Sequence, residues 1–323
     1  MIDAQAERLR ARVDAARAAA GGAPAPVAAR PPQAPRLART VAVASGKGGV
    51  GKSTVALGIA MAAAERGVRT ALVDADLGLA NLDLLAGVRA PRTVAAWLGG
   101  HASLSECFVS VAPRLWLLPG ASGVARMADL EPAQRSRLVE GLSRVALHVQ
   151  LMVVDLGAGI GAGTLDVAAA ADRVLLVTTP EPTALVDAYG FVKSCARRGC
   201  RGSWSVAVNM ARDEADGERA LARIAHAARS HLGVALADMG SVRFDGEVAD
   251  AVRARRPVLL AAPRGRASTD LRRLEARLAG LEGEGAGAEG SGFFRDLAMR
   301  LGLRVAPIAA AAGVAATAGF VAG

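Results

Sequence analysis

A glycine-rich loop is the part of this sequence best suited to chemistry. Residues 46–53 read GKGGVGKS and satisfy the phosphate-loop pattern G-x-x-x-x-G-K-[ST]. Its backbone N–H groups are expected to surround a β-phosphate, Lys52 to bridge the β- and γ-phosphates, and the Ser53 hydroxyl to bind Mg²⁺. The residues expected to hold ATP here are Gly46, Gly48, Gly49, Val50, Gly51, Lys52, Ser53 and Thr54.

A second lysine accompanies the loop. Of the 39 basic side chains only Lys47, Lys52 and Lys193 are lysines, and two of them lie five residues apart. Arginine is a rigid planar fork, whereas lysine is a compact charge on a flexible stem that fits between phosphate oxygens. The exception therefore indicates that Lys47 also serves the phosphate site.

Carboxylates end two apolar segments. Asp155 closes LMVVD, and Asp74 closes TALVD with Asp76 two residues beyond. The carboxyl ends of parallel strands share one edge of a sheet, so these carboxylates should lie beside the loop. We expect Asp155 to hold Mg²⁺ through water.

Short apolar runs alternate with amphipathic segments along the chain. Runs at 41–45, 70–74, 151–155, 173–179 and 204–209 have the length of buried strands, and helical patterns occupy 52–65, 132–148, 181–197 and 214–231. This alternation predicts an α/β fold with a mostly parallel, doubly wound sheet flanked by helices.

Composition limits the class of protein. Hydrophobic residues make up 52 % and aromatic residues 3 %, so the core must consist mainly of Ala, Val and Leu. The net charge of +9 fits an anionic partner, either lipid or nucleic acid. The three cysteines form no C-x-x-C pair and are interpreted as reduced packing residues in a cytoplasmic protein, and the charged N-terminus has no secretory signal.

Three regions are expected. Residues 1–39 combine a short helix with a Pro/Ala-rich tether, residues 40–281 form the phosphate-loop domain, and residues 282–323 hold a Gly-rich linker, a helix and an uncharged tail from residue 305. In that last helix Phe293, Phe294, Leu297 and Leu301 share one stripe. The stripe predicts binding to an acidic membrane surface, with packing on the chain's own domain as the alternative.

The sequence KGGVGKST resembles the deviant Walker A ATPases, which include MinD and ParA. The resemblance implies an ATP-driven homodimer in which Lys47 reaches the partner's nucleotide. The family's pattern D-x-D-x-G-x-x-N-x-D is matched here from Asp74 to Asp83. This match implies that Asp76 positions the attacking water. Asn209 matches the residue that reads the adenine ring.

Several stretches, including DADLGLANLDLLAG and TTPEPTALVDAY, look like the flagellar FlhG (YlxH or FleN) branch of that family. This branch sets flagellar number and placement, works with an FlhF-like GTPase and flagellar switch proteins, and is peripherally membrane-associated. The QAxxLR element from Gln5 resembles its GTPase-stimulating segment, although Ala4 separates Asp3 from Gln5. Arg243-Phe244 departs from the family's Pro-aromatic pair.

Other functions fit the sequence less well. Within the same fold, a division-site MinD or a DNA-partitioning ParA is the alternative, and the amphipathic C-terminal stripe argues against DNA. A scaffold without turnover is opposed by Asp76 and Asp155. An iron–sulfur electron carrier would need cluster-binding cysteines, for which Cys195 and Cys200 lack the context.

Overall fold

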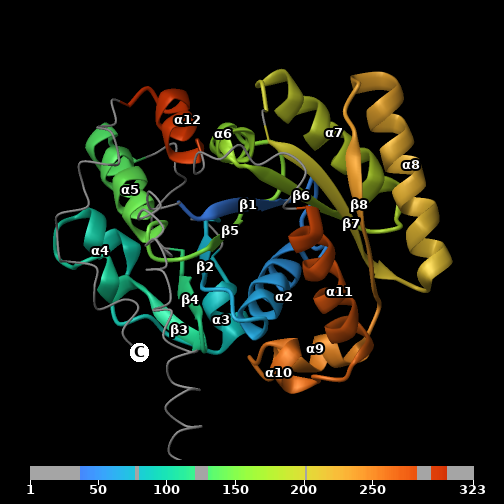
Figure 1. Cartoon of the computed structure of the whole chain (residues 1–323), viewed down its shortest axis with the longest axis horizontal. Coiled ribbons are helices and arrows are strands. Elements are labelled where there is room, and N and C mark those ends of the chain that lie inside the picture. Colours follow the sequence, from blue (N-terminus) through green and yellow to red (C-terminus); the bar gives the residue numbers. More distant parts are fainter. Residues whose placement is uncertain (1–36, 77–79, 121–129, 201, 282–291, 304–323) are drawn as a thin grey trace, which may run out of the picture. The chain divides into compact units, whose positions relative to one another are not determined.

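One eight-stranded sheet organises the structure (Figure 1). The computed structural model describes residues 37–76, 80–120, 130–200, 202–281 and 292–303. The strand order is β3-β4-β2-β5-β1-β6-β7-β8, and all neighbours run parallel except β3 and β4. The strands are β1 (Arg39–Ala44), β2 (Thr70–Asp74), β3 (Val109–Ala112), β4 (Leu115–Leu118), β5 (Leu151–Asp155), β6 (Arg173–Thr178), β7 (Ser203–Ala211) and β8 (Leu236–Arg243).

Helices cover both faces of this sheet. They are α2 (Lys52–Glu65), α3 (Leu82–Ala86), α4 (Val94–Leu98), α5 (Pro132–Val145), α6 (Ala162–Ala170), α7 (Pro182–Arg197), α8 (Glu214–Leu232), α9 (Gly246–Arg253), α10 (Val258–Ala261), α11 (Arg266–Gly280) and α12 (Phe293–Arg300), with a 3-10 turn η1 (Ser105–Cys107). The predicted doubly wound α/β sheet is confirmed.

Successive side chains of the strands point alternately into two separate cores. In β1, Ala42 and Ala44 pack into the core under α5, α6, α7, α8 and α12. Val41 and Val43 face the opposite core under α2, α3, α9, α10 and α11. Side chains alternate across a strand, so a continuous apolar run is what a sheet covered on both faces requires.

The sequence analysis did not predict the strands at the two edges of the sheet, β3 and β8. The short strand β3 is half-exposed, and β8 mixes polar with apolar residues. The β7–β8 pairing shifts register twice, close to Met210 and Gly240, both of which have positive φ. Bulges and charges of this kind protect an edge strand from pairing with other chains, and they also erase its periodic pattern.

Helix α12 exists, but its apolar stripe does not face solvent. Phe293, Phe294 and Leu297 are buried in the core that α5 and α6 cover, and Leu301 packs at its margin. Figure 1 shows α12 beside α5 and α6. Arg300 donates to the carbonyl oxygens of Arg198 and Gly199 just after α7, at 2.8 and 2.9 Å. In this conformation the stripe therefore packs on the chain's own domain, the alternative that the sequence left open, and its binding to a membrane stays a prediction.

None of the helices in the described ranges combines the length and the apolarity needed to span a bilayer. The tail from residue 305 and Gln5 lie outside the described residues.

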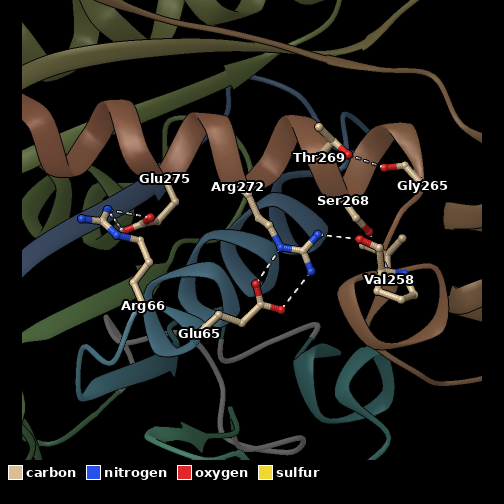
Figure 2. Close-up of polar contacts among 9 residues, drawn as sticks. Glu65, Arg66, Val258, Gly265, Ser268, Thr269, Arg272 and Glu275 are labelled. Carbon is tan, nitrogen blue, oxygen red and sulfur yellow. Dashed lines mark hydrogen bonds and ion pairs between the residues drawn. The ribbon is translucent and has the colours of Figure 1, made fainter.

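Helix α11 packs along α2, the helix that follows the phosphate loop. Figure 2 shows two ion pairs between α11 and the end of α2: Arg272 with Glu65, at 2.6 and 3.0 Å, and Glu275 with Arg66, at 2.9 and 3.1 Å. The helices also approach closely, because a Cβ at Gly58 of α2 would lie 2.7 Å from a Leu271 methyl group. The loop's helix is thus fixed along its length.

We predict that Gly58→Ala destabilises the fold, with Gly190→Ala in α7 as the matched control. Both glycines lie inside helices, but a Cβ at Gly190 meets nothing within 4 Å. Helix propensity favours alanine by about 1 kcal/mol at both sites, while overpacking at Gly58 costs about 1–3 kcal/mol. Urea denaturation should show Gly58→Ala clearly less stable than Gly190→Ala. Equal stabilities would contradict the close α2–α11 contact.

Candidate nucleotide site

The phosphate loop lies between β1 and α2, at the carboxyl edge of the sheet. A Cβ at Gly46 would come within 2.0 Å of the Asp187 carbonyl oxygen in α7, so only glycine lets the loop pack there. Gly51 has φ of 79° and ends the loop at the N-cap of α2, a conformation that favours glycine. Cβ atoms at Gly48 and Gly49 would meet none of the described residues within 4 Å, so within that part of the chain this side of the loop is open.

Lys52 is buried and pairs with Asp155. Its Nζ lies 2.5 Å from Asp155 Oδ1 and 3.3 Å from Ser53 Oγ. The other oxygen, Asp155 Oδ2, is buried and has no hydrogen-bond partner among the described residues. Desolvation raises the pKa of Asp155, while the Lys52 ammonium lowers it. One lysine, one hydroxyl and one incompletely satisfied carboxylate therefore converge at the start of α2.

Asp74 anchors the segment after β2. Its Oδ2 accepts from the backbone N–H groups of Asn81 and Leu82 at 3.2 and 3.3 Å, and its Oδ1 accepts from Asp76 N–H at 3.1 Å. Burial, followed by the charge of Asp155, raises the pKa of Asp74 to about 7. The Asp76 carboxyl lies 3.6 Å from where a Cβ at Gly157 would be, beside the end of β5.

Lys47 is held by α7. Its Nζ lies 3.4 Å from Glu181 Oε2 and 3.3 Å from Thr183 Oγ1, and the two charged side chains are 41 % and 67 % exposed. An ion pair so open to water contributes at most about 1 kcal/mol. Lys47 is therefore only weakly fixed in this conformation, in contrast with buried Lys52.

Asn209 lies against the loop from the end of β7. Its Nδ2 donates to the Val50 carbonyl oxygen at 2.8 Å, and a Cβ at Gly51 would lie 2.2 Å from the same nitrogen. The exposed side chain of Met210 lies near the end of β7, and that of Phe244 directly follows β8. Asn209 therefore lies at the loop, and its contact with an adenine ring stays a prediction.

The structure brings together Lys47, Lys52, Ser53, Asp76, Asp155 and Asn209 around residues 46–51. It does not bring the α12 stripe to this site, because α12 contacts α5 and α6. Sequence reasoning missed Glu181 and Thr183 as partners of Lys47, although TTPEPT follows a strand at this edge.

Arg243 also gains a structural explanation. Its backbone N–H and guanidinium all donate to Asp270 of α11, at 2.8–3.1 Å. A proline would have no N–H to give and no charge for Asp270. The departure from the Pro-aromatic pair thus fastens the end of β8 to α11.

The residues present fit a nucleotide with Mg²⁺. The open glycine side of the loop, the Lys52 ammonium and the amides at the start of α2 suit phosphate oxygens. Mg²⁺ commonly binds one or two protein oxygens and completes its octahedron with phosphates and water. The Ser53 hydroxyl and the unpartnered Asp155 Oδ2 supply oxygen donors of that kind.

The raised pKa of Asp74 predicts that the stability of the fold depends on pH. Between the unfolded value of 3.8 and the folded value of about 7, the folded chain holds a proton that the unfolded chain has released. The contribution of Asp74 to the free energy of unfolding is therefore fully present below about pH 4. It declines toward pH 7, by on the order of a few kcal/mol. Asp74→Asn should flatten that decline in denaturation curves. An unchanged pH profile would contradict the raised pKa.

Comparison with known proteins agrees with this geometry. Residues 41–284 match the CobQ/CobB/MinD/ParA nucleotide binding domain. The chain is 37 % identical over 230 residues to the antiactivator FleN of Pseudomonas aeruginosa, an alignment that covers 71 % of this chain and 82 % of FleN. It is 39 % identical over 153 residues to the flagellum site-determining protein YlxH of Helicobacter pylori, covering 47 % of this chain and 52 % of YlxH.

A solved structure shares the fold. The septum site-determining protein MinD from Pyrococcus horikoshii, complexed with Mg-ADP, superposes with a TM-score of 0.63 at 24 % identity, covering 76 % of this chain and 98 % of that one. The matched domain and the FleN alignment show that this chain belongs to the CobQ/CobB/MinD/ParA nucleotide-binding family and is a homologue of the FleN/FlhG-type flagellar regulators.

Proposed function

We propose that this protein is an ATP-dependent dimerising ATPase that controls the number and placement of flagella. Homology to FleN and YlxH supports the flagellar role, and the nucleotide site supports the ATPase. The observation that best supports ATP-dependent dimerisation is the position of Lys47. Its side chain contacts α7 of the same chain and is only weakly held there.

The proposed residue roles combine the positions of these side chains with the family resemblance. The backbone of residues 46–51 and Lys52 hold the phosphates of ATP, Ser53 and Asp155 hold Mg²⁺, and Asn209 contacts the base. Bound Mg²⁺ neutralises charge on the phosphates. Lys47 leaves Glu181 and stabilises the terminal phosphate of the partner subunit's nucleotide, while Asp76 positions water. Lys52 exchanges Asp155 for phosphate.

Membrane attachment is proposed through α12. Its stripe is buried here, so attachment requires the helix to leave α5 and α6 and Arg300 to release the carbonyls after α7. One short helix binds lipid weakly, and a dimer that presents two binds far better. The N-terminal segment with Gln5 is proposed to contact an FlhF-like GTPase, and flagellar switch proteins are the further partners.

We predict that Lys47→Ala and Lys52→Ala abolish ATP-driven dimers and that Asp76→Ala accumulates them. The lysine variants lose charge on the phosphates, whereas the Asp76 variant binds ATP but hydrolyses it slowly. Light scattering after gel filtration with ATP and Mg²⁺ measures the mass directly. Wild-type protein that stays monomeric with ATP and Mg²⁺ would contradict the proposed switch.

The same variants connect the switch to the flagellum. In cells that lack the gene, wild type should restore the normal flagellar count, and Lys52→Ala should not. Full restoration by Lys52→Ala would contradict a flagellar role for nucleotide binding.

We also predict that Glu181→Gln strengthens ATP-driven dimerisation by about 2- to 5-fold, because removal of an exposed ion-pair partner frees Lys47 at a gain of up to about 1 kcal/mol. Glu218→Gln, an exposed change on α8, is the matched control. Sedimentation across a protein dilution series gives the dimer dissociation constant. A weaker dimer in Glu181→Gln would show that Glu181 acts across the interface instead.

A further inference from the structure

Two of the chain's three cysteines lie together at the end of α7. Cys195 is in the last turn of this helix and is buried, and Cys200 follows the helix and is half-buried. The third, Cys107, is buried in η1. All three are thiols, and the surrounding core consists mainly of Ala, Val and Leu. Packing alone therefore does not require two of so few thiols to meet at one place.

The turn after α7 brings the two cysteines together. Gly199 has φ of 71°, and its N–H donates to the Ala196 carbonyl oxygen at 3.0 Å. This conformation and this bond belong to the Schellman motif, in which the second residue after the helix cap contacts the third-last helical residue. With Arg198 as the cap of α7, those two residues are Cys200 and Cys195.

Both sulfur atoms also lie against α6. Cys195 Sγ is 4.0 Å from the Leu165 carbonyl oxygen, and Cys200 Sγ is 3.9 Å from the Ala168 carbonyl oxygen. Residues three apart lie on the same side of a helix. The two thiols are within hydrogen-bonding reach of each other as well. The fold therefore directs both side chains to one point between α6 and the end of α7.

The interaction between the thiols makes them chemically unequal. It raises the pKa of Cys195, whose S–H is the donor, and burial raises that pKa further. The same interaction lowers the pKa of Cys200 against the effect of burial, and the charge of Arg300 lowers it too. The thiolate is the reactive form of cysteine. Cys200, which is also the more exposed of the two, is therefore the nucleophile of the pair.

A metal ion fits this place less well than a bond between the sulfurs. Structural zinc takes four nitrogen or sulfur ligands. Within the described ranges, His, Cys, Asp and Glu side chains form no group of three or more that could hold a metal ion. Two thiols that face each other without further ligands are instead the precursor of a disulfide.

We propose that Cys195 and Cys200 are a redox-active pair that hydrogen peroxide converts into a reversible disulfide. The Cys200 thiolate attacks one peroxide oxygen, so that an S–O bond forms and the O–O bond breaks. The hydroxide that leaves takes up the proton that Cys200 had released and becomes water. The Cys195 sulfur then attacks the Cys200 sulfur, the S–S bond forms, the S–O bond breaks, and the oxygen leaves as water with the Cys195 proton. Two electrons pass from the thiols to the peroxide.

The turn between the cysteines is free to close as this reaction requires. Arg197, Arg198 and Gly199 are exposed, and a Cβ at Gly199 would meet none of the described residues within 4 Å. A disulfide holds its sulfurs at about 2.05 Å, so the two sulfurs must approach each other. An exposed turn permits that movement while the core stays packed. In a reducing compartment such a bond is transient and serves redox sensing rather than stability.

The test maps the bond directly and does not depend on the function proposed above. Wild type, Cys195→Ser, Cys200→Ser and the matched control Cys107→Ser are treated with a small molar excess of hydrogen peroxide, both folded and in urea. Remaining thiols are blocked, and trypsin is added without reductant. Trypsin cuts after lysine and arginine, so Cys195 falls in the peptide SCAR and Cys200 in the peptide GCR. Mass spectrometry detects the two peptides joined.

Folded wild type should lose two of its three thiols and yield the joined SCAR–GCR peptide, at a rate that does not depend on protein concentration. Dithiothreitol should restore both thiols. Cys107→Ser should behave like wild type at the pair, and Cys200→Ser should lose no thiol over the same time. Cys195→Ser should form a sulfenic acid at Cys200 that dimedone traps, because the second thiol is missing.

Three results would overturn the proposal: no joined peptide from folded wild type, oxidation of Cys107 before the pair, or a joined peptide that forms as fast in urea as in the folded protein. The last result would show that nearness in sequence, and not the fold, brings the sulfurs together. Wild type alone decides each of these points, so a variant that fails to fold leaves the test intact.

Discussion

The contact between Lys52 and Asp155 is the constraint on which the nucleotide site depends. A buried ammonium and a buried carboxylate at 2.5 Å each lose hydration, and their mutual attraction offsets most of that loss. Removing one partner of such a pair typically costs about 3–5 kcal/mol, because the remaining charge stays buried. A phosphate group can take the place of Asp155 as the anion beside Lys52. In the proposed exchange Lys52 keeps an anion beside it with and without ligand, and Asp155 becomes available to a cation when the lysine turns to phosphate.

Close packing gives this pair its fixed position. Gly46 lets the loop press against the α7 backbone, Gly51 starts α2, and α11 clamps the far end of α2 through two ion pairs (Figure 2). Asp74 fixes the segment that carries Asp76 to the same edge. Lys47 is the exception, since two exposed contacts hold it loosely. The rigid part of the site suits binding, and its one loosely held charge suits a switch between subunits.

The central strands and the phosphate loop could be predicted from sequence because their signals are local. A buried parallel strand is a continuous apolar run, and a loop that admits phosphate needs glycines at fixed spacing. Glu181 and Thr183 were not predicted because their role depends on α7 packing against the phosphate loop, a contact between residues far apart in the chain. The α12 stripe was identified, but an amphipathic pattern does not tell whether the apolar face meets lipid or the domain, and here the domain buries Phe293 and Phe294.

The scarcity of lysine permits a direct test of the exchange of anions. Lysine labelled with carbon-13 at Cε gives signals only from Lys47, Lys52 and Lys193, and Lys193 in α7 has no role in the site. On addition of a non-hydrolysable ATP analogue with Mg²⁺, the Lys52 signal should shift at every protein concentration, and the Lys47 signal should shift only where dimers form. A Lys47 signal that moves with Lys52 in the monomer, or that stays unchanged in the dimer, would contradict the proposed role of Lys47 between subunits.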